Sequence, residues 1–361
     1  MATSFNIETL PDDCVSTILS YTSPQDACRF SMVSSTLRSA ADSDMVWRSF
    51  FPSDYHDVVS RAVNPLILKS SSYKHLFYAL CNPLLLDGGN MSFKLDKSSG
   101  KKSYIISARE LSIAWSNDPM YWIWRSMPES RFQEVAVLRT VNWLEIQGKI
   151  RTRILTPNTI YGAYLIMKIT HREYGLDSAA SEVRVAVANE VKNGRVYLSR
   201  KDENKQKEET LLHGNRMFGN ILIQDRGIPV PSQREDDGWM EIELGEFFSG
   251  EADQEVKMSL MEVGYQLKGG LIVEGIEVRP KQVGPRKLGF CNPLDAELWG
   301  ILKGLELAWG TGARRVELEC DSEIALNTIQ EGSNNHINSQ VVSRIYKWLA
   351  EDWDVRWVHT F

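Results

Sequence analysis

Two carboxylates near the end of the sequence have the setting of a hydrolytic metal site. Glu297 lies in an amphipathic helical stretch, and Asp321 directly follows the strand-like segment RVELEC. A metal-dependent nuclease begins its site in this way, because carboxylates hold two divalent cations about 4 Å apart that activate water and stabilise the leaving oxygen. Two carboxylates cannot hold such a pair of cations alone, so these residues predict only part of a nuclease site.

Two tryptophans, Trp115 and Trp122, lie seven residues apart in the polar segment SIAWSNDPMYWIW. An exposed aromatic face can stack on the C–H face of a pyranose ring, and nearby carboxylates can accept hydrogen bonds from its hydroxyl groups. The same region contains Trp124, Trp143 and Trp239, and tryptophans in such a domain are mostly buried. The pair therefore has two interpretations, a sugar contact or core packing.

The other residue types that perform chemistry form no recognisable constellation. The histidines show no i, i+4 metal spacing; they are His56, His75, His171, His213, His336 and His359. No G-x-S-x-G motif, phosphate-binding loop or Ser/His/Asp order stands out. The sequence therefore predicts neither a bound metal nor a cofactor.

Composition limits the partners of the chain. Its net charge of −6 and pI of about 5.7 argue against a dedicated nucleic-acid-binding protein, which usually carries a basic face. The cysteines form no C-x-x-C pair, which is typical of a reducing compartment; they are Cys14, Cys28, Cys81, Cys291 and Cys320. The N-terminal residues contain no apolar run, and the chain has no apolar stretch of membrane-spanning length. We expect a protein of the cytoplasm and nucleus without a membrane contact.

Residues 1–80 have helical periodicity, with apolar residues at steps of three and four. Ser23 and Pro24 mark a helix start, since a capping hydroxyl precedes a proline that suits the first helical position. Residues 90–280 alternate with period two in runs such as VRVAVANEV and GLIVEGIEV, which favours an antiparallel sandwich. Within them, residues 199–238 are charged and rich in loop-forming types, which predicts a long surface loop.

Residues 281–361 return to alternating helix and strand. The Gly-Pro pair in KQVGPRK indicates a linker. The next helix carries one apolar stripe formed by Leu294, Leu298, Ile301, Leu305 and Ala308. The segment RVELEC predicts a strand, two helices follow it, and DVRWVHTF predicts a final strand.

The segment LPDDCVSTILSYTSPQDACRFSMVSSTLRSAADSDMVW resembles an F-box. A bundle of about forty residues is marginal alone, so part of its apolar surface would remain uncovered until a partner covers it. The resemblance implies that this partner is the Skp-type adaptor of a cullin-based ubiquitin ligase. It also implies adaptor contacts at Leu10, Pro11, Ile18, Leu19, Val33 and Leu37. The alternative for each of these residues is a place in the core.

Residues 90–281 resemble the plant phloem lectins, also called Nictaba-like lectins. The resemblance is carried by ARELSIAWSNDPMYWIWRSMPESRFQEVAVLRTVNWLEIQGKI, by DGWMEIELGEFF and by GLIVEGIEVRPK. It implies a β-sandwich that binds N-acetylglucosamine oligomers or N-glycan cores, with Trp115 and Trp122 as sugar contacts and Glu255 and Glu262 as carboxylate partners. A lectin-like domain can also contact proteins without sugar affinity, so this alternative stays open.

The segment AELWGILKGLELAWGTGARRVELECDSEIALNTI resembles RNase H-like domains of reverse-transcriptase origin. Glu297 and Asp321 fall on two of the four acids that this family uses. The residues before the helix, PKQVGPRKLGF, contain no Asp or Glu, and no acid follows the last strand. We therefore expect an inactive remnant in which Glu297 is a helix N-terminal acid; the alternative is an RNA–DNA hybrid nuclease.

These observations predict a multidomain protein with a small all-α F-box bundle, an all-β lectin-like sandwich and a partial α/β RNase H-like segment. The expected boundaries are 1–52 for the F-box, 53–88 for a helical connector, 89–281 for the sandwich, 282–290 for a linker and 291–361 for the last segment. The expected function is substrate recognition for an SCF-type E3 ubiquitin ligase, with a glycan or glycoprotein client and no catalysis by the chain itself.

Overall fold

The computed structural model divides the chain into two compact units, Met1–Lys281 and Gln282–Phe361. The residues that the structure describes are 10–64, 72–199, 228–234, 238–281, 293–310, 314–320, 322–330 and 339–359. No helix in these ranges is long and apolar enough to cross a membrane.

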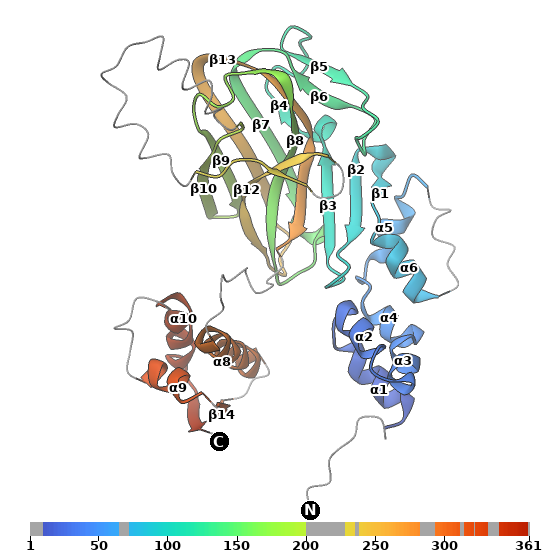
Figure 1. Cartoon of the computed structure of the whole chain (residues 1–361), viewed down its shortest axis with the longest axis vertical. Coiled ribbons are helices and arrows are strands. Elements are labelled where there is room, and N and C mark those ends of the chain that lie inside the picture. Colours follow the sequence, from blue (N-terminus) through green and yellow to red (C-terminus); the bar gives the residue numbers. More distant parts are fainter. Residues whose placement is uncertain are drawn as a thin grey trace, which may run out of the picture. The chain divides into compact units, whose positions relative to one another are not determined.

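Short helices form the N-terminal part of the first unit (Figure 1). They are α1 (Asp12–Ser20), α2 (Pro24–Phe30), α3 (Ser35–Ala41), α4 (Asp44–Ser49), α5 (Tyr55–Ser60) and α6 (Tyr73–Leu80). The predicted start of α2 is confirmed, because the Ser23 hydroxyl accepts the Asp26 amide at 3.1 Å and Pro24 is the first helical residue. Ser34, Ser43 and Ser72 cap α3, α4 and α6 in the same way.

Trp47 lies at the centre of the helical core. It is 1% exposed, and its indole N–H donates to the Ala41 carbonyl at 2.8 Å. The Phe77 ring on α6 is 5.3 Å from it between centroids. Burying an aromatic side chain of this size stabilises a fold by about 1.5–3 kcal/mol. Phe77 belongs to the predicted connector, so the connector contributes to the same core as the F-box helices.

The helices also contact the strands that follow them. The Lys102 ammonium group is almost fully buried and lies 2.9 Å from the Asp54 carboxylate. At Gly100, where φ is +70°, a Cβ atom would meet the Phe50 carbonyl oxygen at 2.9 Å. A side chain at this turn would therefore separate the helical region from the strands.

The predicted antiparallel β-sandwich is confirmed. Its strands are β1 (Leu84–Leu86), β2 (Met91–Leu95), β3 (Lys102–Ser107), β4 (Ser112–Ile113), β5 (Trp122–Arg125), β6 (Val135–Leu138), β7 (Val141–Arg151), β8 (Thr159–Tyr174), β9 (Ser181–Val187), β10 (Glu190–Val196), β11 (Ser232–Gln233), β12 (Met240–Ser249) and β13 (Glu255–Pro280). Of the predicted surface loop 199–238, the described part includes β11, which pairs with β12. Most of that loop lies outside the described residues.

Strand β13 joins the two sheets of the sandwich (Figure 1). Its first half pairs with β7 and β9, in the sheet β4-β7-β13-β9-β10, and its second half pairs with β3, β6 and β8. The sheets face each other closely, since a Cβ on Gly148 of β7 would meet the Ile276 side chain of the other sheet at 2.9 Å. The inner faces share one core that includes Ile146, Met258 and Leu165.

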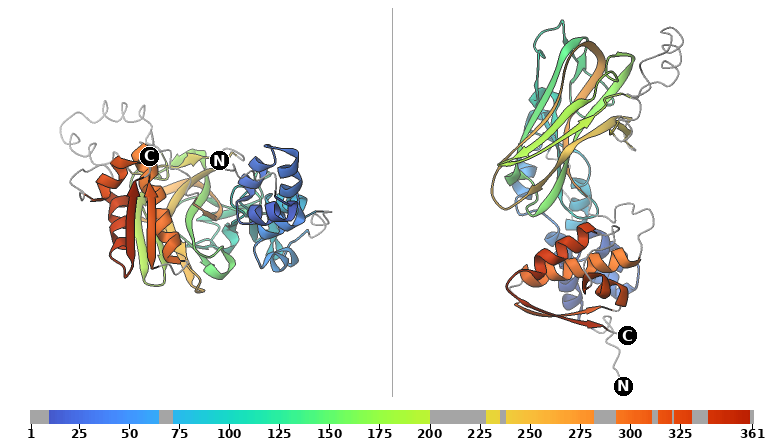
Figure 2. Two further views of the ribbon diagram at one scale, coloured as in Figure 1. Left: turned by 90° about the horizontal axis from the view of Figure 1, so that it is seen from below. Right: turned by 90° about the vertical axis from the view of Figure 1, so that its left-hand side faces the viewer.

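The second unit has the predicted order of elements. They are α8 (Pro293–Gly310), β14 (Arg315–Cys320), α9 (Glu323–Gln330), α10 (Ser339–Leu349) and β15 (Asp354–His359). Strands β14 and β15 pair in parallel, and Figure 2 shows the helices of this unit with the two strands. Leu298, Ile301 and Leu305 of the predicted stripe are buried in its core.

Candidate functional site

Trp115 is presented at the surface of the sandwich by the turn that follows β4. It is 58% exposed and has φ +64°. The left-handed region costs a side chain other than glycine about 1–2 kcal/mol, so the surroundings must hold this turn in place. The Tyr121 ring lies 5.8 Å away between centroids. An indole displayed in this way can stack on an apolar ligand face.

Trp122 is not at the surface, although it was predicted to be a second sugar contact. It is 2% exposed, and its indole N–H donates to the Ala114 carbonyl at 3.0 Å. The indole N–H of Trp124 donates to the Ser116 carbonyl at 3.1 Å. These two indoles hold the backbone on both sides of Trp115, so Trp122 is placed to position Trp115 rather than to touch a ligand.

The structure does not bring Glu255 and Glu262 together. They are seven residues apart on β13, whose register against β7 is unbroken from Glu255 to Val263. An odd spacing along a strand places two side chains on opposite faces, and seven residues span about 23 Å. Glu262 is 8% exposed and lies 2.7 Å from the buried Lys268 ammonium group, whereas Glu255 is exposed. The predicted group of two tryptophans and two glutamates is therefore not one site.

Three polar and aromatic residues absent from the sequence-based set lie on β7, the strand that pairs with β4 just before Trp115. The Ala114 amide donates to the Glu145 carbonyl at 3.0 Å, which sets the Trp115 turn beside β7. Trp143 is 45% exposed, and its indole N–H donates to the Glu145 carboxylate at 2.8 Å. The Gln147 amide donates to the other oxygen of the same carboxylate. The period-two alternation of VNWLEIQGKI is the signal that could have identified these residues, because it gives them one face.

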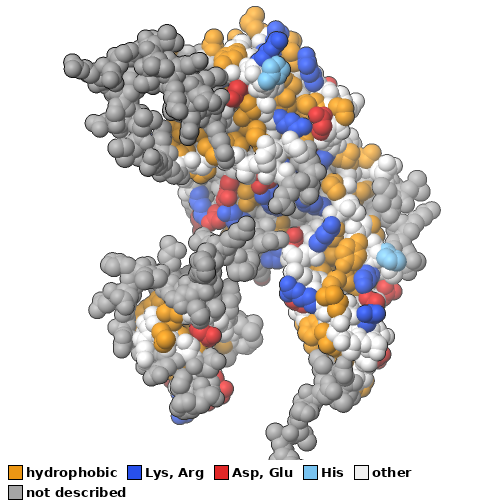
Figure 3. Space-filling model, in the orientation of Figure 1, with side chains coloured by type: hydrophobic (Ala, Val, Ile, Leu, Met, Phe, Trp, Pro, Cys, Tyr) orange, Lys and Arg blue, Asp and Glu red, His pale blue; other side chains and the backbone are white. Residues whose placement is uncertain are grey.

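The predicted adaptor contacts divide between the core and the surface. Leu19 and Leu37 are buried at 1% and 2% exposure, and Leu10 packs partly against the same core. Pro11, Ile18 and Val33 are exposed. The helices also expose the large apolar side chains of Tyr21, Met32 and Met45. Figure 3 shows hydrophobic side chains at the surface of the helical region.

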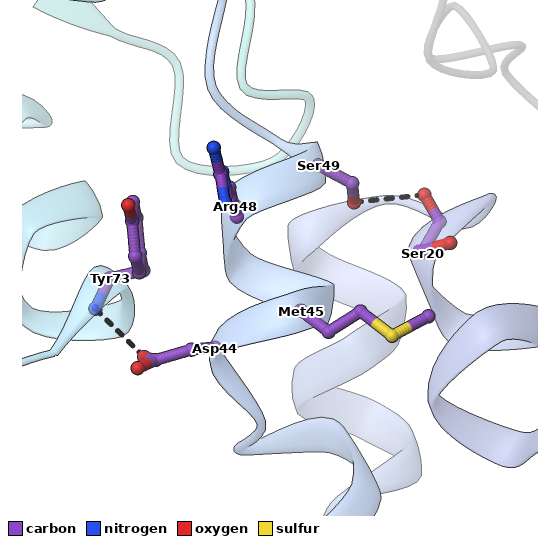
Figure 4. A pocket seen from close by; sticks show the side chains of 6 residues that line it. All are labelled: Ser20, Asp44, Met45, Arg48, Ser49 and Tyr73. Atoms are coloured by element: carbon purple, nitrogen blue, oxygen red, sulfur yellow. Dashed lines mark hydrogen bonds between the residues drawn. The ribbon is translucent and has the colours of Figure 1, made fainter. Parts of the chain in front are cut away.

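A shallow pocket of about 560 Å³ lies among α1, α4 and α6 (Figure 4). Its lining residues are Ser20, Asp44, Met45, Arg48, Ser49 and Tyr73. The Ser49 hydroxyl donates to the Ser20 carbonyl at 3.0 Å, and the Asp44 carboxylate accepts the Tyr73 amide at 3.0 Å. These two hydrogen bonds join helices to one another, so the polar groups of the pocket have a structural role that requires no ligand.

Glu297 lies partly buried on α8, and its carboxylate is 3.8 Å from the Cys320 thiol at the end of β14. Asp321 lies outside the described residues. No group of three or more His, Cys, Asp or Glu side chains in the described ranges could hold a metal ion.

Comparison with known families divides the chain in the same order as its architecture. An F-box domain matches residues 7–49, phloem protein 2 matches residues 101–280, and a reverse transcriptase-like domain matches residues 282–361. Each match is to a family and assigns no role to an individual residue.

Several relatives from Arabidopsis thaliana match about three quarters of the chain. F-box protein PP2-B15 is 49% identical over 286 residues, which are 77% of this chain and 98% of that protein. F-box protein VBF is 46% identical, covering 75% of this chain and 99% of that protein. F-box protein PP2-B13 is 48% identical, with coverage of 75% and 98%. With this identity over almost the whole length of each relative, the chain belongs to the F-box protein PP2-B family of plants.

Proposed function

We propose that this chain is the substrate-recognition subunit of an SCF-type E3 ubiquitin ligase. Its F-box helices bind a Skp-type adaptor and thereby a cullin, and its sandwich selects a glycoprotein client through an N-acetylglucosamine-containing glycan. The observation that carries the proposal is the combination, in one compact unit, of exposed apolar F-box helices and a lectin-like sandwich that displays Trp115.

The adaptor part of the proposal is supported by apolar side chains that the fold leaves outside its core. Ile18 is 44% exposed, Val33 69% and Met32 74%, although the core around Trp47 is closed. Burying apolar surface against a partner stabilises the complex by about 25 cal/mol per Å². Among the predicted contacts, Ile18 and Val33 fit an adaptor interface, and Leu19 and Leu37 support it from the core.

The client part of the proposal is supported by Trp115 and by the family of the sandwich. The exposed Trp115 indole is held by the buried Trp122 and the partly buried Trp124, which makes it a rigid apolar surface. Rigidity lowers the entropy cost of binding a ligand. The rival, a protein-binding sandwich without sugar affinity, would use the same surface.

The second unit takes no part in catalysis in this proposal. Residues 280–294 contain no Asp or Glu, so an acid ahead of α8 is missing, and two cations need more carboxylates than Glu297 and Asp321 supply. About three quarters of this chain matches the Arabidopsis relatives over almost their whole length. We also propose that the protein works in the cytoplasm and nucleus, since free thiols such as Cys14 and Cys28 suit a reducing compartment.

The adaptor interaction is tested by co-purification of the full chain with a Skp-type adaptor. The double substitution Ile18→Asp and Val33→Asp should abolish the complex. It should change the free energy of unfolding by no more than about 0.5 kcal/mol from wild type, because both side chains are exposed. Ile324→Asp, at a residue 68% exposed in the other unit, is the matched control and should still bind. Failure of the wild-type chain to co-purify with the adaptor would refute the proposal.

Two further assays separate the rival functions. A glycan array probed with the full chain should give signal on N-acetylglucosamine oligomers; an empty array would favour the protein-binding rival. Cleavage of a labelled RNA–DNA hybrid with magnesium or manganese should be absent. Robust cleavage that Asp321→Asn removes would instead support the nuclease.

A further inference from the structure

The outer face of β7 carries a fixed carboxylate between two polar or aromatic neighbours. Trp143, Glu145 and Gln147 alternate with the buried Leu144 and Ile146, so the three share the face that points away from the core. The two ends of the row are about 13 Å apart. Trp115 begins beside the middle of the row, because the preceding residue, Ala114, is hydrogen-bonded to Glu145.

The Glu145 carboxylate is oriented before any ligand arrives. One oxygen accepts the Trp143 indole N–H at 2.8 Å, and the other accepts the Gln147 amide. A carboxylate has about four acceptor positions, so each oxygen keeps one for a ligand. In the part of the chain that the structure describes, no Lys or Arg forms an ion pair with Glu145. Its charge therefore remains available to strengthen a hydrogen bond from a ligand.

The neighbouring strand extends this surface. On β13, Val263 lies opposite Trp143 and Met261 lies opposite Glu145. Val263 is 54% exposed, and Met261 is half-buried. Met261 and Val263 thus border the Glu145 carboxylate on the β13 side, and the Trp143 indole borders it along β7. This arrangement suits a pyranose ring, which has an apolar face and hydroxyl edges.

We propose that Trp143, Glu145 and Gln147, together with Trp115, form the carbohydrate-contacting strip of this sandwich, with Glu145 as acceptor for a hydroxyl or acetamido N–H of a neutral pyranose. This inference rests on the proposed function, since it names the residues that would recognise the glycan. Because Glu145 is negative and has no cationic partner, an acidic sugar is excluded as the preferred ligand.

The test is a titration of the purified full chain with chitotriose, followed by calorimetry and by tryptophan fluorescence. Trp115→Ala should abolish binding, and Glu145→Ala and Trp143→Ala should each weaken it at least about tenfold. Glu190→Ala is the matched control, because it removes an exposed carboxylate from β10 of the same sheet, and it should leave affinity unchanged. Sialyllactose, a negatively charged probe, should bind more weakly than chitotriose.

The outcomes separate this inference from the proposed function. A wild-type chain that binds no glycan overturns both. A wild-type chain that binds chitotriose and loses it in Trp115→Ala but keeps full affinity in Glu145→Ala overturns the strip and leaves the carbohydrate function. Tighter binding of sialyllactose than of chitotriose also overturns the strip. Circular dichroism and the melting temperature should match wild type in each variant, since all four substituted side chains are wholly or partly exposed.

Discussion

The two halves of β13 are one continuous strand in two different environments. From Glu255 to Val263 its side chains alternate between exposed or half-buried and buried, so one face meets the core and the other is open. From Leu271 to Val278 the side chains are buried on both faces. The same strand therefore offers a surface in its first half and offers none in its second.

The second half is covered by the chain itself. A separate apolar cluster of Val135, Ile166, Trp239 and Ile272 lies on its outer face, since Ile166 points away from the Leu165 side chain of the main core. The buried Glu274 carboxylate accepts the Arg131 amide at 2.9 Å and the Arg131 guanidinium at 2.8 Å. Trp239 donates its indole N–H to the Glu129 carbonyl at 3.0 Å.

The two halves also differ in the charged side chains on their outer faces. Glu277 is fully buried and contacts Arg234, Arg279 and Lys94. Glu255, in the first half, has only a 3.5 Å ion pair with Lys257 at the surface. The comparison teaches that the outer-face carboxylates of the second half stabilise the sandwich, whereas the outer-face carboxylate of the first half, Glu255, contributes little to stability.

The largest expected effect tests this difference directly. Glu277→Ala removes the buried carboxylate that Lys94, Arg234 and Arg279 share and leaves the two arginines with Glu241. It should lower the free energy of unfolding of the sandwich by about 3 kcal/mol. Glu255→Ala should change it by less than about 0.5 kcal/mol. Urea unfolding followed by circular dichroism measures both, and equal losses in the two variants would remove the distinction between the halves.

The second-largest expected effect is that acid lowers the stability of the second half of β13, because it protonates Glu277. Burial raises the pKa of Glu277, but the charges of Arg234, Lys94 and Arg279 outweigh it and lower the pKa to about 2. Since the folded pKa lies below the unfolded value of about 4.3, the stabilisation is complete above about pH 5 and is lost as the pH falls toward 2. About 3 kcal/mol is at stake. Melting temperatures recorded across this range should fall less steeply in Glu277→Gln than in the wild type; parallel curves would contradict the assignment.

The smallest predicted effect concerns Trp122 and Trp239, whose indole N–H groups each donate to a backbone carbonyl. Trp122→Phe keeps the buried ring but leaves the Ala114 carbonyl without its donor, which should cost about 1–2 kcal/mol and weaken chitotriose binding several-fold. Trp239→Phe removes the equivalent hydrogen bond in the covered half. It should cost a similar free energy and leave binding unchanged. A binding loss in Trp239→Phe equal to that in Trp122→Phe would show that both act through general stability.

The type and order of the elements could be predicted because each depends on local pattern. The caps of the helices, the period-two runs of the sandwich and the apolar stripe of α8 are read from neighbouring residues. The candidate site could be predicted only in part. Trp115 was predicted from its polar context together with the resemblance to the phloem lectins. The burial of Trp122 depends on where the Ala114 carbonyl lies, which is set by the pairing of β4 with β7.

The sequence by itself determined that this chain has helices, then antiparallel strands, then an α/β segment, since periodicity and capping act over a few residues. Only the tertiary structure decided which residues share a surface. Glu255 and Glu262 have equal spacing to Trp115 and Trp122, yet the pleat of one continuous strand sends the two carboxylates to opposite faces. The turn that carries Trp115 lies beside Trp143, Glu145 and Gln147 because β4 pairs with β7, and strand pairing joins residues that are distant along the chain.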